Sequence, residues 1–202
     1  MLTSNDLQLV FDKYREKYAR IFQGMYPAKN NTGFPERNLS VNFSKAVEEL
    51  YPSAYSWFEF QFGANNNLHF DAVIIVPETK TLFVVESKRF SNLKKKTEGI
   101  NGDILRINKV PSEYREEFEA RIAGFADFTV YGVILADVWT ETKGKGKIRD
   151  AFANGSFVSD YLPGLIDSGA SAGSYFVCGF EGTTNYHNLN DHYYLLSVVW
   201  KP

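Results

Sequence analysis

The stretch LHFDAVIIV (68–76), PETK (77–80) and TLFVVESK (81–88) decides the fold. Its outer segments are rich in Val, Ile and Phe, which are typical of strands, and the segment between them has the composition of a tight turn. An antiparallel hairpin is therefore predicted over 68–88. Upstream, 56–62 alternates as a further strand with Phe58, Phe60 and Phe62 on one face, so the three strands form a meander.

The predicted hairpin brings charged side chains together at one end. A four-residue turn centred between Glu78 and Thr79 places Asp71 opposite Glu86. Lys88, two residues further on, shares the face of Glu86. Opposed side chains lie about 5 Å apart between Cβ atoms, and like charges at that distance repel unless a cation lies between them. The pattern therefore predicts a cation at this end of the hairpin.

The chemistry of these groups indicates which cation is expected. Carboxylate oxygens with room for water suit Mg²⁺, so Asp71 and Glu86 are the predicted ligands, and the backbone carbonyl of Ser87 is a further one. Mn²⁺ is expected to substitute. A metal there polarises a phosphate oxygen and lowers the pKa of a bound water, while Lys88 positions that water or offsets developing charge. The implied reaction is phosphodiester hydrolysis.

Asp71, fourteen intervening residues and then Glu86-Ser-Lys88 resemble the D…ExK signature of the PD-(D/E)XK nuclease superfamily. The resemblance implies a restriction-endonuclease-like fold. In that fold a helix and a three-stranded meander carry the site, and a helix and a fourth strand complete the core. It also implies a Mg²⁺-dependent endonuclease acting on DNA in restriction, repair or defence. It covers 35–88 and, more loosely, the chain to 138. Phe70 stands where the superfamily name has proline.

Two other ExK triplets show why the signature needs geometry. Glu78-Thr-Lys80 lies in the predicted turn, with no carboxylate expected opposite it. Glu141-Thr-Lys143 follows Asp127 at a comparable spacing, but these acids flank one predicted strand. At roughly 3.3 Å per residue that strand holds them on the order of 40 Å apart. Only the set at 71, 86 and 88 has a register that lets its members meet.

The helix before the meander offers a further acid. Phe43, Ala46 and Val47 form its buried stripe, and Glu36, seven residues before Phe43, falls on the same face. Members of the superfamily often bring an acidic residue from this helix towards the metal, which makes Glu36 a candidate catalytic carboxylate. The alternative is a first-turn glutamate that is favourable to the helix dipole.

The remaining elements follow from periodicity. Helices are predicted over 5–22, 35–50 (opening at Pro35), 92–109 and the segment after Pro111, and strands over 128–138, 174–180 and 192–200. In the segment after Pro111 the predicted helical stripe is Tyr114, Phe118, Ile122 and Phe125. Together these give an α/β (α+β) fold, a mixed central sheet with a three-stranded meander flanked by helices. We expect one domain over 1–202, with a packing helix at 5–22, a core at 35–138 and C-terminal strands within 174–200.

Nucleic-acid contacts are expected to be local, because the formal net charge is only −2. The candidate phosphate-binding residues are Lys94, Lys95 and Lys96 after the hairpin, and Lys143, Lys145 and Lys147 in the loop ETKGKGK (141–147). A solvated helix start is the alternative for the first group. His69 is a further candidate near the phosphate, with an ordinary strand histidine as the alternative.

Composition bounds the rest. With 202 residues, 44% of them hydrophobic, the chain is long and apolar enough to bury a core. The single cysteine, Cys178, excludes an internal disulfide and favours a reducing, cytoplasmic setting. The longest aliphatic run, 72–76, is far short of the roughly 18 residues of a membrane helix, so no membrane association is expected. A homodimer is a possibility that the sequence does not decide, since no segment marks an interface.

Two other interpretations compete with the nuclease. A catalytically idle protein of the same fold, acting as a nucleic-acid-binding or partner subunit, is favoured by the slightly acidic charge and by the lack of a dedicated recognition motif. The intact set of two acids and a lysine favours turnover, because a retired site is free to lose it. The third interpretation is an α/β domain whose charged hairpin end carries no site.

Overall fold

The computed structural model describes residues 2–25, 36–63, 67–89, 93–141, 150–151, 154–167, 175–184 and 191–202. Within the elements, the side chains at 22, 23, 25, 93–96, 138–141, 167, 175–184 and 191–194 are not described. Pro35 and the loop lysines Lys143, Lys145 and Lys147 lie outside the described residues.

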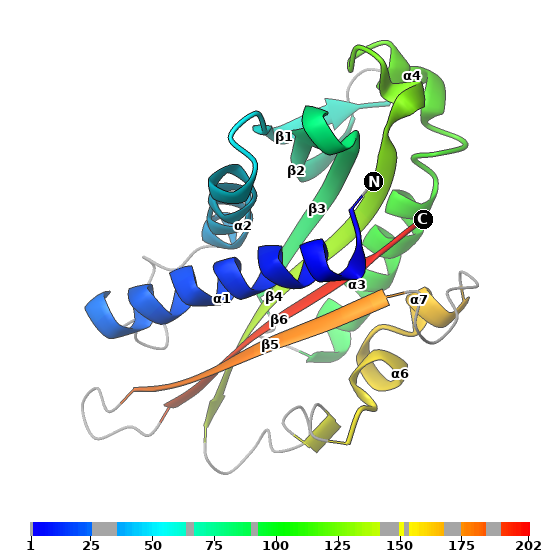
Figure 1. Cartoon of the computed structure of the whole chain (residues 1–202). Helices are drawn as coiled ribbons and strands as arrows, with labels where there is room; N and C mark the ends of the chain where they lie inside the picture. Colours follow the sequence, from blue (N-terminus) through cyan, green and yellow to red (C-terminus); the bar gives the residue numbers. More distant parts are fainter. Residues whose placement is uncertain are drawn as a thin grey trace.

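A six-stranded mixed sheet forms the centre of the fold, with strand order β1-β2-β3-β4-β6-β5 (Figure 1). The strands are β1 (Tyr55–Phe62), β2 (Leu68–Val76), β3 (Thr81–Arg89), β4 (Thr129–Glu141), β5 (Tyr175–Thr184) and β6 (Asp191–Trp200). β3 and β4 are parallel, and the other neighbouring strands are antiparallel. The coarse prediction of a mixed α/β fold with a three-stranded meander is confirmed.

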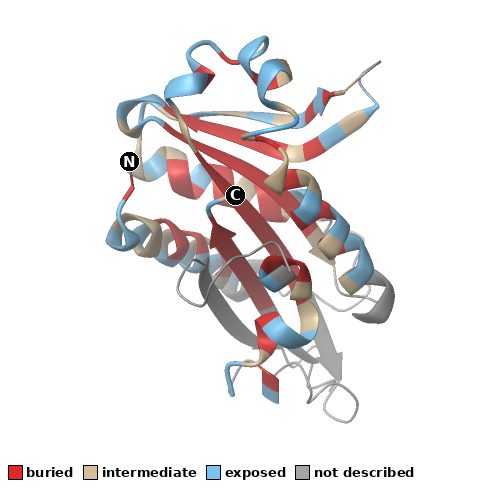
Figure 2. Cartoon of the chain, turned by 90° about the vertical axis from the view of Figure 1, so that its right-hand side faces the viewer, coloured by how far each residue is buried: buried red, intermediate tan, exposed pale blue. Residues whose placement is uncertain are grey.

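Helices cover both faces of this sheet. On one face α1 (Ser4–Met25) and α2 (Arg37–Leu50) share a buried cluster with the strands. On the other face lie α3 (Leu93–Asn108), α4 (Arg115–Glu119), α6 (Phe157–Tyr161), α7 (Pro163–Asp167) and the short 3₁₀ turn η3 (Phe125–Asp127). Figure 2 shows the buried residues running along the central strands between these two layers. No described helix is both long and apolar enough to cross a membrane.

The predicted hairpin register is confirmed. Pro77–Thr79 forms the 3₁₀ turn η2, Lys80 is left-handed, and Ala72 pairs with Val85 as a turn centred between Glu78 and Thr79 requires. The apolar segments 72–76 and 82–85 are fully buried because helices cover both faces. This rigid hairpin positions the charged residues that follow its last ladder pair.

Two details differ from the prediction. Phe58 packs against the α1/α2 cluster, whereas Phe60 and Phe62 belong to the opposite cluster. Glu59 between them has a left-handed backbone with φ 53°, which interrupts the two-residue alternation of the strand. The helix predicted after Pro111 is also shorter than expected. The predicted apolar stripe extends to Phe125, but α4 ends at Glu119. Its later apolar residues are still buried, but in turns and in η3.

Gly132 in β4 is expected to be intolerant of substitution. A Cβ there would lie 2.5 Å from Trp200 Cζ2 and 2.8 Å from Ile107 Cγ2, and the Trp200 Nε1–H donates to Asn108 Oδ1 at 2.8 Å. Because the indole cannot move without losing this bond, Gly132→Ala is expected to lower the unfolding free energy by about 1–3 kcal/mol. Chemical denaturation measures the change.

Gly102→Ala in α3 is the matched control. Nothing lies within 4 Å of a Cβ at this position, so the helical propensity of alanine should raise stability by up to about 1 kcal/mol. Equal midpoints for the two variants would contradict the tight contact at Gly132.

Candidate functional site

The site lies where β2 and β3 separate. Their pairing ends at Ala72 and Val85, so the next N–H groups of β3 on that side need other acceptors. The Ser87 N–H donates to Asp71 Oδ2 at 2.6 Å, and the Arg89 N–H donates to Glu36 Oε1 at 2.7 Å. The two carboxylates thus continue the hydrogen bonding of β3 beyond its ladder with β2. Asp71 reaches β3 through its side chain, not as a ladder partner of Glu86.

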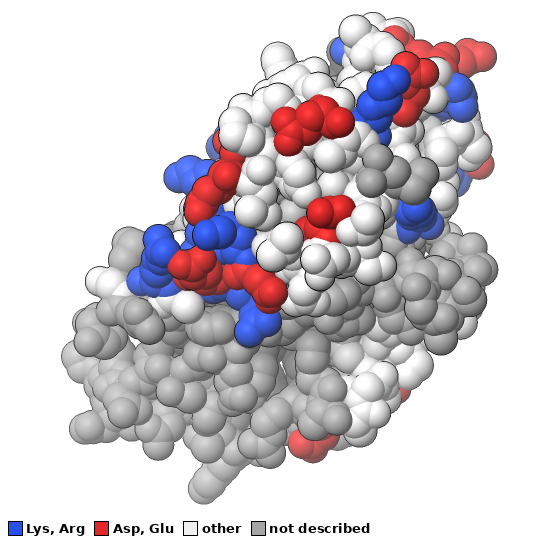
Figure 3. Space-filling view, viewed as in Figure 1, with Lys and Arg blue, Asp and Glu red and all other residues white. Residues whose placement is uncertain are grey.

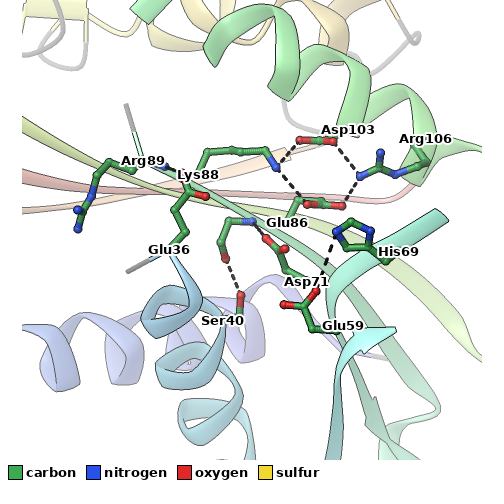
Figure 4. Close-up of polar contacts among 11 residues, drawn as sticks. Glu36, Ser40, Glu59, His69, Asp71, Glu86, Lys88, Arg89, Asp103 and Arg106 are labelled. Atoms are coloured by element: carbon green, nitrogen blue, oxygen red, sulfur yellow. Dashed lines mark hydrogen bonds and ion pairs between the residues drawn. The ribbon is translucent and has the colours of Figure 1, made fainter. Parts of the chain in front are cut away.

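Glu86 and Lys88 point from β3 towards α3, where they meet two residues of that helix (Figure 4). Glu86 is 2% exposed and forms ion pairs with Lys88, at 3.4 Å, and with Arg106. Asp103 is 6% exposed. It lies 3.0 Å from Lys88 Nζ and 2.8 Å from Arg106 Nη2. The arrangement is a closed set of two acids and two cations, with Asp71 beside it.

Electrostatics in this cluster favour additional positive charge. Burial raises the pKa of Glu86, the neighbouring carboxylates of Asp103 and Asp71 raise it further, and the net value is about 8. Lys88 and Arg106 act in the opposite direction without restoring the usual range. Burial also raises the pKa of Asp71, although the hydrogen bond from the Ser87 N–H acts to lower it. Burial alone lowers the pKa of Lys88, but Glu86 and Asp103 outweigh it and the net shift is upward.

Ser87 points to the opposite face of the sheet. Its Oγ lies 2.6 Å from Ser40 Oγ of α2, both residues are buried, and either hydroxyl can donate. The contact fixes β3 against α2 between the two charged residues. A ligand role for the Ser87 carbonyl stays a prediction.

Glu36 lies immediately before α2 and is partly buried. Its carboxylate makes no capping bond to the helix and reaches the Arg89 backbone instead. Arg89 in turn pairs with the buried Asp137 of β4 at 3.3 Å. The structure thus places Glu36 at the end of β3, against Arg89, the residue that follows Lys88. The catalytic role of Glu36 stays a prediction.

Asp103 and Arg106 were not predicted from the sequence. A signal for them existed, because Asp103 lies three residues after Ile100 and Arg106 precedes Ile107, on or beside the buried stripe of the helix. Polar residues on a buried stripe require partners, and those partners are Glu86 and Lys88. Arg106 also stacks over the Phe70 ring, with Cζ 5.3 Å from its centroid.

Among the described residues, the alternative ExK triplets assemble no comparable site, and Thr142 and Lys143 of the second triplet lie outside those residues. Glu78 and Lys80 lie at the turn end of the hairpin, where Glu78 accepts a hydrogen bond from Ser53 and Lys80 pairs with Asp127. Asp127 and Glu141 lie at opposite ends of the β4 region, as predicted.

The predicted phosphate-binding lysines are placed only in part. Lys94, Lys95 and Lys96 open α3, next to β3, but their side chains are not among the described ones. On the face seen in Figure 3, the described basic and acidic side chains are interleaved around α1 and α2, as in the pairs of Lys13 and Lys17 with Glu49. The described residues of that face therefore do not form a uniformly basic surface.

Comparisons with protein-family models, curated proteins and solved structures found no match. The candidate function therefore depends on the site itself.

Proposed function

We propose that the chain is a Mg²⁺-dependent nuclease of the PD-(D/E)XK type that hydrolyses phosphodiester bonds of DNA. The observation that carries the proposal is the grouping of Asp71, Glu86 and Lys88 at the end of a rigid hairpin. The Ser87 N–H links Asp71 to the residue between the other two. The element order α2-β1-β2-β3-α3-α4-β4 also supports it, because it contains the helix, meander, helix and fourth strand that the resemblance implies, with α4 as an addition.

The residues present fit a magnesium ion by donor type and by charge. Carboxylate oxygens of Asp71 and Glu86 are the hard ligands that Mg²⁺ prefers. Three carboxylates, including that of Asp103, share the cluster with only two cations, Lys88 and Arg106. Burial is the largest cause of the raised pKa of Glu86, and the neighbouring carboxylates of Asp103 and Asp71 raise it further. A divalent cation held by Asp71 and Glu86 would offset this repulsion between carboxylates.

Each residue has a defined task in the proposed reaction. Asp71 and Glu86 hold the metal ion, which when bound polarises a phosphate oxygen and lowers the pKa of a coordinated water. Lys88, cationic and held by Asp103 at 3.0 Å, orients the attacking water and offsets charge developing on the phosphate. Glu36 fixes the end of β3 by accepting the Arg89 N–H, which keeps Lys88 in place.

The direct test is cleavage of supercoiled plasmid and of linear duplex DNA with Mg²⁺, with Mn²⁺ and with a chelator. Cleavage should require a divalent ion and should disappear in Asp71→Asn. Titration of the same variant with Mg²⁺, followed by thermal unfolding, should show loss of metal-dependent stabilisation. If the wild-type chain cuts no nucleic acid under broad screening of ions and sequences, the proposal fails.

A second function is favoured by one observation, namely that both carboxylate oxygens of Glu86 already face cations. Oε1 meets Arg106 and Oε2 meets Lys88. A chain that kept this closed set would bind DNA or a partner protein without turnover. The two functions predict different behaviour with Mg²⁺ alone: an active nuclease binds the ion and loses it in Asp71→Asn, whereas an idle module shows no binding in either form.

Asp103 is expected to act as a positioning residue for Lys88. Asp103→Asn removes a carboxylate that raises the pKa of Lys88, so the lysine should lose its proton at lower pH. We expect kcat to fall roughly tenfold, with little change in KM, and the alkaline limb of the pH–rate profile to move to lower pH.

Asp127→Asn is the matched control, because Asp127 also pairs with a lysine, Lys80, but at the far end of the hairpin. Its profile should equal that of the wild type. A shift of the same size in both variants would show that the Asp103 effect is not local.

A further inference from the structure

A second group of metal-ligating side chains lies at the outer edge of the sheet, next to the site described above. Glu59 of β1 and His69 and Asp71 of β2 place one ligand atom each within 4.8 Å of one another. His69 Nε2 lies 4.0 Å from Glu59 Oε2, and Figure 4 shows both side chains beside Asp71. The group combines an imidazole with two carboxylates, which is a mixed donor set and not an acidic cluster alone.

The backbone of β1 explains how Glu59 reaches this position. Phe58 pairs with Ala72 and Phe60 with Phe70, but no ladder pair joins Glu59 to Asp71 between them. Glu59 adopts φ 53° there, which turns its side chain out of the regular alternation. The pairs on both sides of the interruption keep one register, which sets Glu59 across from Asp71 on the neighbouring strand.

Charge distinguishes this group from the Glu86 cluster. Glu86 and Asp103 each have Lys88 and Arg106 as ion-pair partners. Among the described residues, no lysine or arginine lies within 4.0 Å of the carboxylate of Glu59 or Asp71. Two carboxylates this close repel one another unless a cation lies between them, and His69 is a metal ligand in its neutral form.

We propose that Glu59, His69 and Asp71 form a Zn²⁺ site. Three protein ligands leave one tetrahedral position for water, the arrangement of an open zinc site. Imidazole favours Zn²⁺ over Mg²⁺, so the two ions would be sorted by ligand type. The Glu59 and His69 side chains are 55% and 58% exposed, so they are free to close around an ion from their present separations.

A hollow of about 380 Å³ adjoins the proposed site and gives an ion access from solvent. Trp57, Glu59 and Arg121 contribute to its lining, and Trp57 is 66% exposed. Glu59 belongs to both the hollow and the ligand group, whereas His69 and Asp71 are not part of the hollow's lining. Sharing Asp71 with the proposed magnesium site would couple the two ions, but zinc binding itself requires no turnover.

The test is calorimetric titration of the wild-type chain with ZnCl₂ in the presence of excess Mg²⁺. One zinc site is expected, and it should weaken roughly tenfold or more in His69→Ala and in Glu59→Gln. Both positions are exposed, and circular dichroism checks that these variants remain folded.

Two variants make the result specific. Glu86→Gln removes a proposed magnesium ligand and should retain the zinc site. His192→Ala changes a histidine of β6, three strands away in the sheet order, and should also retain it. Absence of zinc binding by the wild type, unchanged binding in His69→Ala, or loss of binding in His192→Ala would overturn the proposal. Failure of DNA cleavage leaves these titrations unaffected, so the two proposals fail separately.

Discussion

Lys88→Ala is expected to lower the rate of DNA cleavage by roughly a hundredfold or more while the chain stays folded. Lys88 lies on β3, as does the proposed metal ligand Glu86, and its ammonium group contacts both Glu86 and Asp103. Without it, no ammonium orients the water or offsets charge on the phosphate. Plasmid nicking at saturating Mg²⁺ measures the rate, and circular dichroism measures the fold.

Lys80→Ala is the matched control for this loss. Lys80 lies on the same hairpin, is 62% exposed in its side chain and pairs with Asp127. Its removal should leave the cleavage rate unchanged, because the turn is at the far end of the strands from Glu86. Retention of full activity by Lys88→Ala would exclude the catalytic role assigned to the lysine.

Glu86→Gln is expected to have opposite effects on activity and stability. It removes a ligand of the proposed metal, so cleavage should be lost. Without metal it should raise the unfolding free energy at neutral pH, because Glu86 is buried beside Asp103 and Asp71 and its pKa is raised to about 8. The gain should be on the order of 1–3 kcal/mol. Asp103 remains as a partner for Lys88 and Arg106.

The sign of the pH dependence follows from the raised pKa. Between about 4.5, the ordinary value, and about 8, the folded chain holds a proton on Glu86 that the unfolded chain has released. The contribution of this group to stability is therefore fully present below pH 4.5 and is lost as the pH rises through 8. In chelator, the stability advantage of Glu86→Gln should grow over this window and vanish at its acid end.

Magnesium should make the wild type more stable than Glu86→Gln, the reverse of the order expected in chelator. Binding to the folded state alone stabilises by about 2.7 kcal/mol at a hundred times the dissociation constant, and only the wild type has the intact ligand pair. Glu98→Gln, an exposed carboxylate of α3, should change neither stability nor its response to magnesium. A Glu86→Gln chain less stable than the wild type at pH 8 in chelator would contradict the assigned burial cost.

The hairpin could be predicted because its signals are local. The apolar runs that flank 77–80 and the length of the turn determine the register, and Ala72 pairs with Val85 as expected. What failed is the assumption that pairing continues to Asp71. Where a ladder stops depends on which other groups can satisfy the backbone, and here the acceptor Glu36 comes from a distant part of the chain.

The site was predicted only for the residues that lie on the hairpin. Asp103 and Arg106 join it because α3 packs across β3, a tertiary contact that no spacing within the motif encodes. The face of Phe58 was predicted wrongly because a glutamate with positive φ is rare, and strand alternation offers no warning of it. Propensity rules thus fail at Glu59, where the proposed zinc ligands meet.

The carboxylates of Asp71 and Glu36 replace the missing ladder partners of β3, so their presence in a chain of this fold has a structural explanation. Positions 71 and 36 each supply an oxygen that a main-chain amide of β3 requires, whatever chemistry takes place nearby. A chain of this fold without the proposed hydrolysis would still need those oxygens to keep the end of β3 in place. The two acids are therefore expected whether or not the proposed hydrolysis takes place. Among the described contacts, the amine of Lys88 makes no bond to the main chain, so position 88 is the one that would distinguish the proposed enzyme from an idle chain.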